Sequence, residues 1–216
     1  MTWLLSINKT TCYWTLAIVT IVFSIASSHF LMTDELYYSS YAEQLTKEQI
    51  HQMLTWANDS VLRFLGYIIL PVIILVRVLF TSFCLQVGNL IQEYHWKYEK
   101  LYNISLKADA IYLLSSVCNF YFYAFFQPAK NIKELNINFL SVLKLKGFEN
   151  VQSWLVMAFN SLNVFELLYI ILLIVLIKAS LRLSFLKSTI FVILTYCIGN
   201  YIYVIAMTFV YLNVAQ

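Results

Sequence analysis

Charged residues are scarce in this chain of 216 residues, because Asp, Glu, Lys and Arg together make up only 12% of it. Soluble domains carry about a quarter charged residues. Apolar residues account for 61% of the sequence, and a water-soluble fold of this size could not bury so much apolar surface. The composition therefore excludes an ordinary soluble domain and predicts a membrane protein, folded as a single transmembrane domain over residues 1–216.

Glycine and proline are also rare, with four Gly and two Pro in the chain. Transporters built on broken helices use unwound backbone to coordinate their cargo, so this scarcity counts against a carrier of that kind. The four cysteines lie far apart in the sequence and have no metal-knuckle spacing, so we expect small core side chains. The net charge of +3 is small and dispersed over several loops, which predicts no nucleic-acid partner.

The chain is organised around an apolar run of 28 residues, 64–91, with one full charge, Arg77, near its centre. A helix of this length outruns the roughly 30 Å hydrocarbon core of a bilayer, so it must tilt, bend or protrude. Pro71 predicts a kink in the preceding turn. An arginine at mid-span costs about 2.5 to 3.5 kcal/mol on insertion scales and faces a partner or a wet cavity. We therefore expect the other helices to pack around this segment.

Hydropathy predicts an all-α fold, a polytopic transmembrane helix bundle with about five spans and interfacial amphipathic helices. The expected spans are residues 12–32, 64–91, 108–127, 162–181 and 186–212. Residues 33–60 predict two short amphipathic helices, the second opened by a capping box of Thr46 and Gln49. Lysines interrupt residues 128–160 too often for a span, and this interval predicts an interfacial helix.

Five spans would place the two ends of the chain on opposite sides of the membrane. With a cytoplasmic N-terminus, the inner loops hold seven Lys and Arg residues and the outer loops hold six. Short inner loops weigh more than one long outer loop, so the positive-inside rule favours a cytoplasmic N-terminus.

Motifs for catalysis are missing from the sequence. It has no HExxH, no GxS turn, no pair of acids within a span and no two histidines on one helix face. The sequence therefore predicts neither an enzyme nor a metal or cofactor site.

The candidate functional residues are the polar and ionisable groups at membrane depth, which are Arg77, Asp109, Asn119, Glu166 and Lys178. Arg77 either lines an ion pathway or is held by hydrogen bonds between helices, and its lack of a matching acid favours the structural role. A pairing of Arg77 with Glu166 would have to bridge about two helical turns in depth by snorkelling. Asp109 is expected to stabilise a helix N-terminus, and Asn119 to hydrogen-bond between helices.

Three features of the sequence suggest a family. Residues 93–114 read EYHWKYEKLYNISLKADAIYLL, residues 162–194 form a paired apolar block, and this block opens with LNVFELLY. With the five spans and the long second one, these features resemble bacterial members of the Yip family, named for proteins that interact with Ypt/Rab GTPases. In that family an xNxFxxWY-like segment introduces the last two spans. The resemblance covers most of residues 59–212.

The resemblance implies a non-catalytic accessory role, because the family has no agreed enzymatic activity and some bacterial relatives are small partners of ABC exporters that handle toxic peptides. Residues 34–39 read DELYYS and lack the Gly-Pro of the eukaryotic DLYGP-type motif, which argues against a GTPase-linked trafficking role. The resemblance transfers no functional residues.

These observations predict an accessory or regulatory partner of a larger complex in a bacterial inner membrane, with an ABC-type exporter as the favoured case. The expected contacts are membrane lipids and either a membrane-protein partner or a second copy of the chain. Two alternatives remain open: a small transporter or channel with Arg77 on its pathway, and an immunity protein against a membrane-active peptide.

Overall fold

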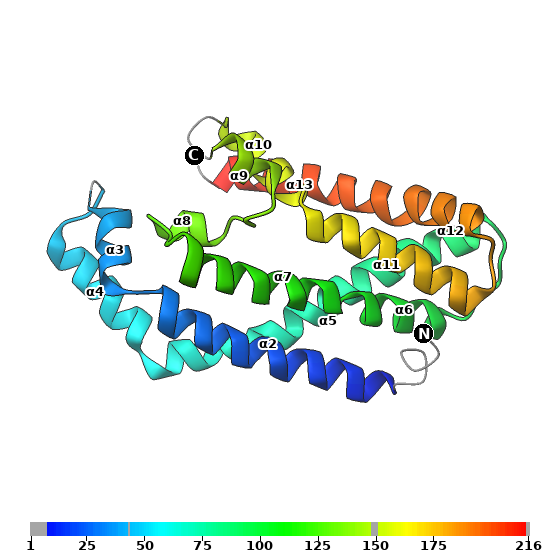
Figure 1. The fold of residues 1–216 in the computed structure, drawn as a ribbon, viewed down its shortest axis with the longest axis horizontal. Helices are drawn as coiled ribbons and strands as arrows, with labels where there is room; N and C mark the ends of the chain where they lie inside the picture. Colours follow the sequence, from blue (N-terminus) through cyan, green and yellow to red (C-terminus); the bar gives the residue numbers. More distant parts are fainter. Residues whose placement is uncertain (1–7, 43, 148–150, 215–216) are drawn as a thin grey trace.

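The structure, a computed structural model, describes residues 8–42, 44–147 and 151–214. These residues form α-helices and short π-helical stretches, and contain no strand apart from an isolated bridge between Ser141 and Asn163. The long helices lie side by side in one elongated bundle (Figure 1). The predicted all-α class is therefore confirmed.

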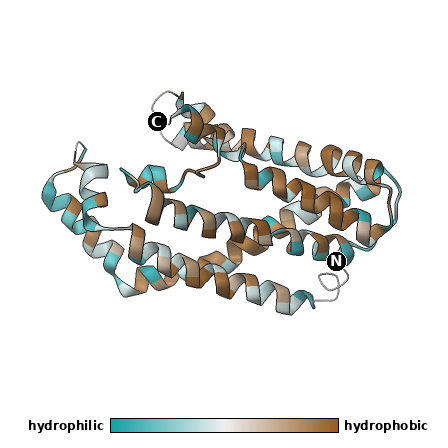
Figure 2. Cartoon of the chain, viewed as in Figure 1, coloured by the Kyte–Doolittle hydropathy of each residue, from teal (hydrophilic) through white to brown (hydrophobic). Residues whose placement is uncertain are grey.

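Among the described residues, four helices are long and apolar enough to cross a membrane. They are α2 (Lys9–Leu31), α5 (Ser60–Ile91), α11 (Val164–Leu181), and α12 (Phe185–Val192) continued through the π-helix η3 (Ile193–Cys197) into α13 (Ile198–Val214). Hydrophobic residues predominate along these helices, whereas hydrophilic residues gather at the ends of the bundle (Figure 2). α11 and α12 pack against each other, as the short turn between them requires.

The segment expected as a third span, residues 108–127, is divided. α6 (Tyr98–Ala108) ends at Asp109, α7 (Ala110–Tyr121) begins immediately after it, and the π-helix η1 (Phe122–Phe126) follows. α6 and α7 run in succession along the bundle in contact with α2 and α11 (Figure 1). α7 and η1 together cover residues 110–126 and are not among the four candidate spans, so the number of crossings stays a prediction.

The first polar interval folds as predicted into α3 (Asp34–Tyr41) and α4 (Lys47–Asn58). The capping box is present, because the Thr46 hydroxyl accepts from the Gln49 backbone and the Gln49 side chain accepts from the Thr46 backbone N–H at 3.0 Å. Local side-chain chemistry therefore decides where α4 begins.

The second polar interval forms three short helices rather than the expected single one. They are α8 (Ile132–Leu135), α9 (Val142–Lys146) and α10 (Ser153–Ser161). Asn131 and Ser141 each cap a new helix start, and Gly147 ends α9 with a φ of 81° that only glycine adopts easily. These breaks explain why one longer helix does not form.

The core lies where α5, α6, α11 and α12 meet, around the fully buried side chains of Leu85, Leu101, Tyr169 and Phe191. α5 continues as one helix past Pro71. The Tyr13 hydroxyl of α2 donates to the Pro71 carbonyl at 2.9 Å, which ties α2 to the middle of α5.

Candidate functional site

A bidentate ion pair lies inside the bundle between α5 and the junction of α6 and α7. Arg77 Nε donates to Asp109 Oδ1 at 2.6 Å, and a second guanidinium nitrogen donates to Oδ2 at 2.7 Å. The Asp109 side chain is only 2% exposed. The guanidinium also lies over the ring of Tyr112, 4.1 Å from its centroid. Fork-to-fork pairs of this kind are the strong form of charge-assisted hydrogen bond.

Glu166, in the first turn of α11, is held by donors from three other segments. Its carboxylate accepts from the Tyr112 hydroxyl at 2.8 Å, from the Tyr196 hydroxyl at 2.7 Å and from Asn200 Nδ2 at 3.3 Å. Tyr112 therefore contacts Arg77 through its ring and Glu166 through its hydroxyl. We call Arg77, Asp109, Tyr112, Glu166, Tyr196 and Asn200 the polar network.

Tyr169 closes the polar network toward the core. Its hydroxyl donates to Thr81 Oγ1 at 2.9 Å, and its ring centroid lies 4.8 Å from that of Tyr112 and 5.1 Å from that of Tyr196. Since Tyr169 is fully buried, these rings shield the charged groups from the core-facing side.

Within the polar network, each charged group is hydrogen-bonded to other members of the network. An anion moving past Arg77 would have to displace a bidentate carboxylate, which favours the structural role of this arginine over a place on an anion pathway. The described residues also contain no group of three His, Cys, Asp or Glu side chains that could hold a metal ion.

The structure gives Arg77 a partner that sequence reasoning missed. Arg77 and Glu166 do not pair directly, because Asp109 is the direct partner of Arg77 and Tyr112 contacts both residues, Arg77 through its ring and Glu166 through its hydroxyl. Asp109 lies at the N-cap of α7, where it was expected, but its side chain makes no capping hydrogen bond there and pairs with Arg77 instead. The feature of the sequence that could have indicated this pair is that Arg77 and Asp109 are each flanked by apolar residues.

Asn119 and Lys178 lie outside the polar network. Asn119 Oδ1 accepts from the backbone N–H of Phe139 at 3.0 Å, so it links α7 to the segment before α9 rather than to another long helix. Lys178 Nζ lies 5.8 Å from the Phe185 ring centroid, near the turn between α11 and α12.

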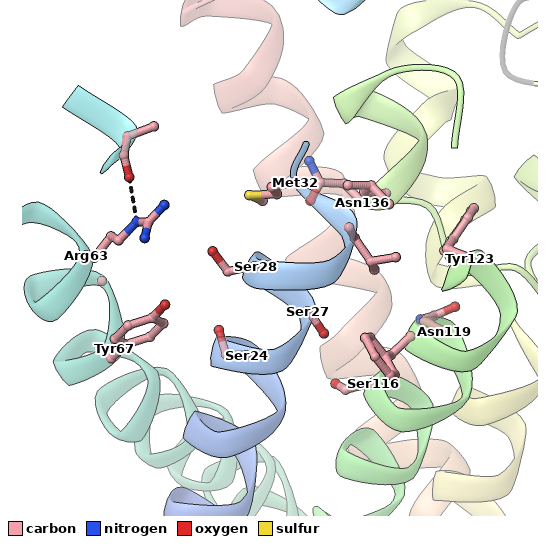
Figure 3. Close-up of a pocket in the computed structure, with 15 residues that line it drawn as sticks. Ser24, Ser27, Ser28, Met32, Arg63, Tyr67, Ser116, Asn119, Tyr123 and Asn136 are labelled. Carbon is pink, nitrogen blue, oxygen red and sulfur yellow. Dashed lines mark hydrogen bonds between the residues drawn. The ribbon is translucent and has the colours of Figure 1, made fainter. Parts of the chain in front are cut away.

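A second candidate site is a cavity of about 480 Å³ between α2, α5 and α7, which we call the serine cavity (Figure 3). Ser24 and Ser28 on α2 point toward Tyr67 and Arg63 on α5, whereas Ser27 points toward α7 (Figure 3). Arg63 is oriented by hydrogen bonds to the Ala57 carbonyl at 2.8 Å and to Asn58 Oδ1.

Four hydroxyl groups that line the serine cavity have no hydrogen-bond partner within the described residues. The hydroxyls of Ser24, Ser27, Ser28 and Tyr67 make no hydrogen bond there. Within the same residues, no carboxylate pairs with Arg63. The four hydroxyls are therefore available to hydrogen-bond a group that approaches between the helices, and the positive charge of Arg63 lies beside them.

A larger cavity of about 880 Å³ adjoins the serine cavity. The two share Leu31, Phe120, Tyr123 and Leu135 in their walls. Sequence reasoning found neither cavity, because the walls come from helices that are distant in the chain.

The fold and these sites define an all-α helical protein with the features of a membrane protein. No protein-family model, curated protein or solved structure significantly matches the chain. The resemblance to the Yip family therefore stays a prediction from the sequence.

Proposed function

We propose that the chain is a non-catalytic integral membrane protein that acts by binding, as an assembly or regulatory partner of a larger membrane complex such as an ABC-type exporter. The observation that carries this proposal is the serine cavity, in which three hydroxyls of α2 have no partner among the described residues. Polar groups at membrane depth are costly when unsatisfied, so an occupant that hydrogen-bonds them is favoured.

The spacing and chemistry of the residues that line the serine cavity favour a helical segment as the occupant. Ser24 and Ser28 are four residues apart, and small residues at that spacing allow close approach of a second helix. Gly66 of α5 also borders the cavity, and a Cβ built on it would meet nothing within 4 Å. Serine hydroxyls hydrogen-bond across such helix contacts, and Arg63 offers a cation at the edge.

The proposal puts the protein in a bacterial inner membrane with a cytoplasmic N-terminus. The resemblance to bacterial Yip proteins and the excess of cations in the short inner loops support this location and orientation. Membrane lipids and a membrane-protein partner, or a second copy of the chain, are then the expected contacts.

A small transporter or channel with Arg77 on its pathway is the rival function. The ion pair argues against this rival function, because the Arg77 guanidinium already donates hydrogen bonds to both carboxylate oxygens of Asp109. Flux of an ion or solute through the purified protein alone in liposomes would favour the rival. An immunity protein against a membrane-active peptide is a further candidate, which uses the same cavity with the peptide as its occupant.

The test is copurification from native membranes in a mild detergent. We expect a stoichiometric membrane-protein partner with the wild-type chain, and its loss with Ser28→Trp, which fills the serine cavity. Ile18→Trp is the matched control, since Ile18 lies on the same helix with 58% of its surface exposed. Both variants must elute as folded proteins. A partner retained by folded Ser28→Trp, or flux without any partner, would overturn the proposal.

A further inference from the structure

α6 and the end of α11 lie at the opposite end of the bundle from α3, α4 and α8 (Figure 1). A basic pocket is lined by residues of α6 and of the end of α11. It has a volume of about 360 Å³, and its polar lining consists of Lys100, Asn103, Lys107, Ser180 and Arg182. The three cations come from two segments that are about 80 residues apart in the chain. Only the packing of α6 on α11 brings them to one place.

Two cations of the basic pocket, Lys100 and Arg182, have no acid partner within the described residues. No Asp or Glu is among the residues that line the pocket. The nearby Glu99 is bound to Lys9 at 2.5 Å. Like charges held close together repel each other, so an anion bound between the cations of the pocket would reduce their repulsion.

The surroundings of the pocket reinforce its positive potential. The segments at this end of the chain, residues 8–10, 93–107 and 178–187, contain seven Lys and Arg residues and two Glu. The described polar segments at the other end, residues 33–42, 44–63, 128–147 and 151–160, contain six Lys and Arg residues and five Asp and Glu. An anion is therefore attracted more strongly to the first end than to the second.

The position of the pocket selects an anion carried by a lipid. α11 is one of the candidate spans, and the pocket lies at its last turn, at the level where hydrocarbon meets headgroups. Along α6 and α7, Ala110 and Leu114 follow Lys107 at helical spacing and are exposed, so an acyl chain can lie beside them. Basic pockets between membrane helices bind phospholipid head groups in this way.

We propose that the basic pocket binds the phosphate of an anionic phospholipid, with Lys100 and Arg182 as the principal cations. Asn103 and Ser180 supply additional hydrogen-bond donors to the phosphate and glycerol oxygens. This inference is independent of the serine cavity, because the two sites lie at opposite ends of the bundle.

The test uses the full chain in neutral detergent micelles with tail-labelled phosphatidylglycerol, followed by fluorescence anisotropy. We expect phosphatidylglycerol to bind more tightly than phosphatidylcholine with the same acyl chains. Each of Lys100→Gln and Arg182→Asn should weaken the binding about fivefold, the effect of one surface cation. Asparagine tolerates the left-handed backbone at Arg182, where φ is 56°, so this variant should keep the fold.

Lys133→Gln is the control, because Lys133 is an exposed lysine at the other end of the bundle. It should change the affinity by less than about twofold. Equal binding of the two lipids, or an equal loss with Lys133→Gln, would overturn the proposal. Displacement of the lipid by millimolar inorganic phosphate would identify a free-anion site instead and would also overturn it. An unchanged thermal midpoint for each variant excludes misfolding as the cause.

Discussion

At the scale of single residues, the polar network shows how a membrane protein tolerates three charged groups inside its bundle. Asp109 and Arg77 neutralise each other, and Glu166 accepts three hydrogen bonds from neutral donors. Removing only one member of the ion pair is expected to destabilise the fold, because the remaining buried charge then has no compensating charge. The pair is therefore tested by removing its members separately and together.

Asp109→Leu should lower the free energy of unfolding by about 1–3 kcal/mol, because it leaves the guanidinium of Arg77, whose side chain is 34% exposed, without its carboxylate. The double variant Arg77→Leu/Asp109→Leu should be more stable than Asp109→Leu, since apolar side chains of similar volume often replace a buried ion pair at little cost. Denaturation in detergent micelles, followed by near-UV circular dichroism, measures both changes.

Asp34→Leu is the control for this pair, because Asp34 is an exposed acid in the first turn of α3. It should cost less than about 1 kcal/mol, the usual contribution of an acid at a helix N-terminus. If Asp109→Leu had the same free energy of unfolding as this control, the ion pair would not contribute to the stability of the bundle.

At the scale of helices, the contacts between elements depend on a few small or capping residues. α5 approaches η3 so closely at Gly88 that a Cβ there would lie 1.9 Å from Thr195 Cγ2. The Thr195 side chain cannot turn away without cost, because its hydroxyl donates to the Phe191 carbonyl at 2.8 Å. The same helix carries Gly66, where a Cβ meets nothing within 4 Å.

Gly88→Ala should therefore destabilise the protein by about 1–3 kcal/mol through overpacking. Gly66→Ala should be neutral or stabilising by up to about 1 kcal/mol, because alanine is the better helix former. Adding Thr195→Ser to Gly88→Ala deletes the clashing methyl group and keeps the hydroxyl, so it should recover part of the loss. Thermal midpoints in one detergent rank the variants, and equal midpoints for the two alanine variants would refute the close approach.

The short helices of the second polar interval depend on Glu134 of α8. Its carboxylate accepts from the Lys130 backbone N–H at 2.8 Å and from Lys144 Nζ at 3.3 Å. Burial alone would raise the pKa of Glu134, but the Lys130 N–H and the Lys144 ammonium outweigh burial, so the pKa is lowered. A lowered pKa means that the stabilisation is present above the ordinary value of about 4.3 and is lost as the pH falls through the lowered value.

We therefore expect protection from hydrogen exchange in residues 130–146 to decrease as the pH falls below about 4. Glu134→Gln should abolish this dependence and lower the local stability by about 0.5–1.5 kcal/mol. Glu48→Gln, in the first turn of α4, should leave the pH dependence of this segment unchanged. Persistence of the same dependence in Glu134→Gln would assign it to another group.

At the scale of the whole molecule, the long elements run back and forth along one axis, and the start of α2 and the end of α13 lie at opposite ends (Figure 1). In the part of the chain that the structure describes, four helices are long and apolar enough to cross a membrane, and α6 and α7 supply a further pass along the bundle. Whether this pass is a fifth crossing decides on which side the chain ends.

Cysteine labelling of intact cells should answer this question. In a background without the four native cysteines, we expect an impermeant maleimide to label Gln44→Cys and Asn213→Cys from outside. Thr10→Cys should react only after permeabilisation. These results follow from a cytoplasmic N-terminus and five crossings. Labelling of Gln44 but not Asn213 in intact cells would indicate an even number of crossings.

The sequence alone determined the properties that depend on neighbours along the chain. The all-α class followed from composition and hydropathy, and the start of α4 followed from Thr46 and Gln49. Both are local effects, because transfer into lipid and helix capping act on residues within one segment.

The tertiary structure decided which groups from distant segments meet. Arg77 found its acid 32 residues away, Glu166 found the Tyr112 hydroxyl 54 residues away, and Lys100 and Arg182 came to share one pocket. A segment such as α11, apolar on nearly every side, carries little signal of which face meets a partner. The rotation and register of such helices are set by packing against the others, and so the ion pair, both cavities and the basic pocket follow from the assembled bundle.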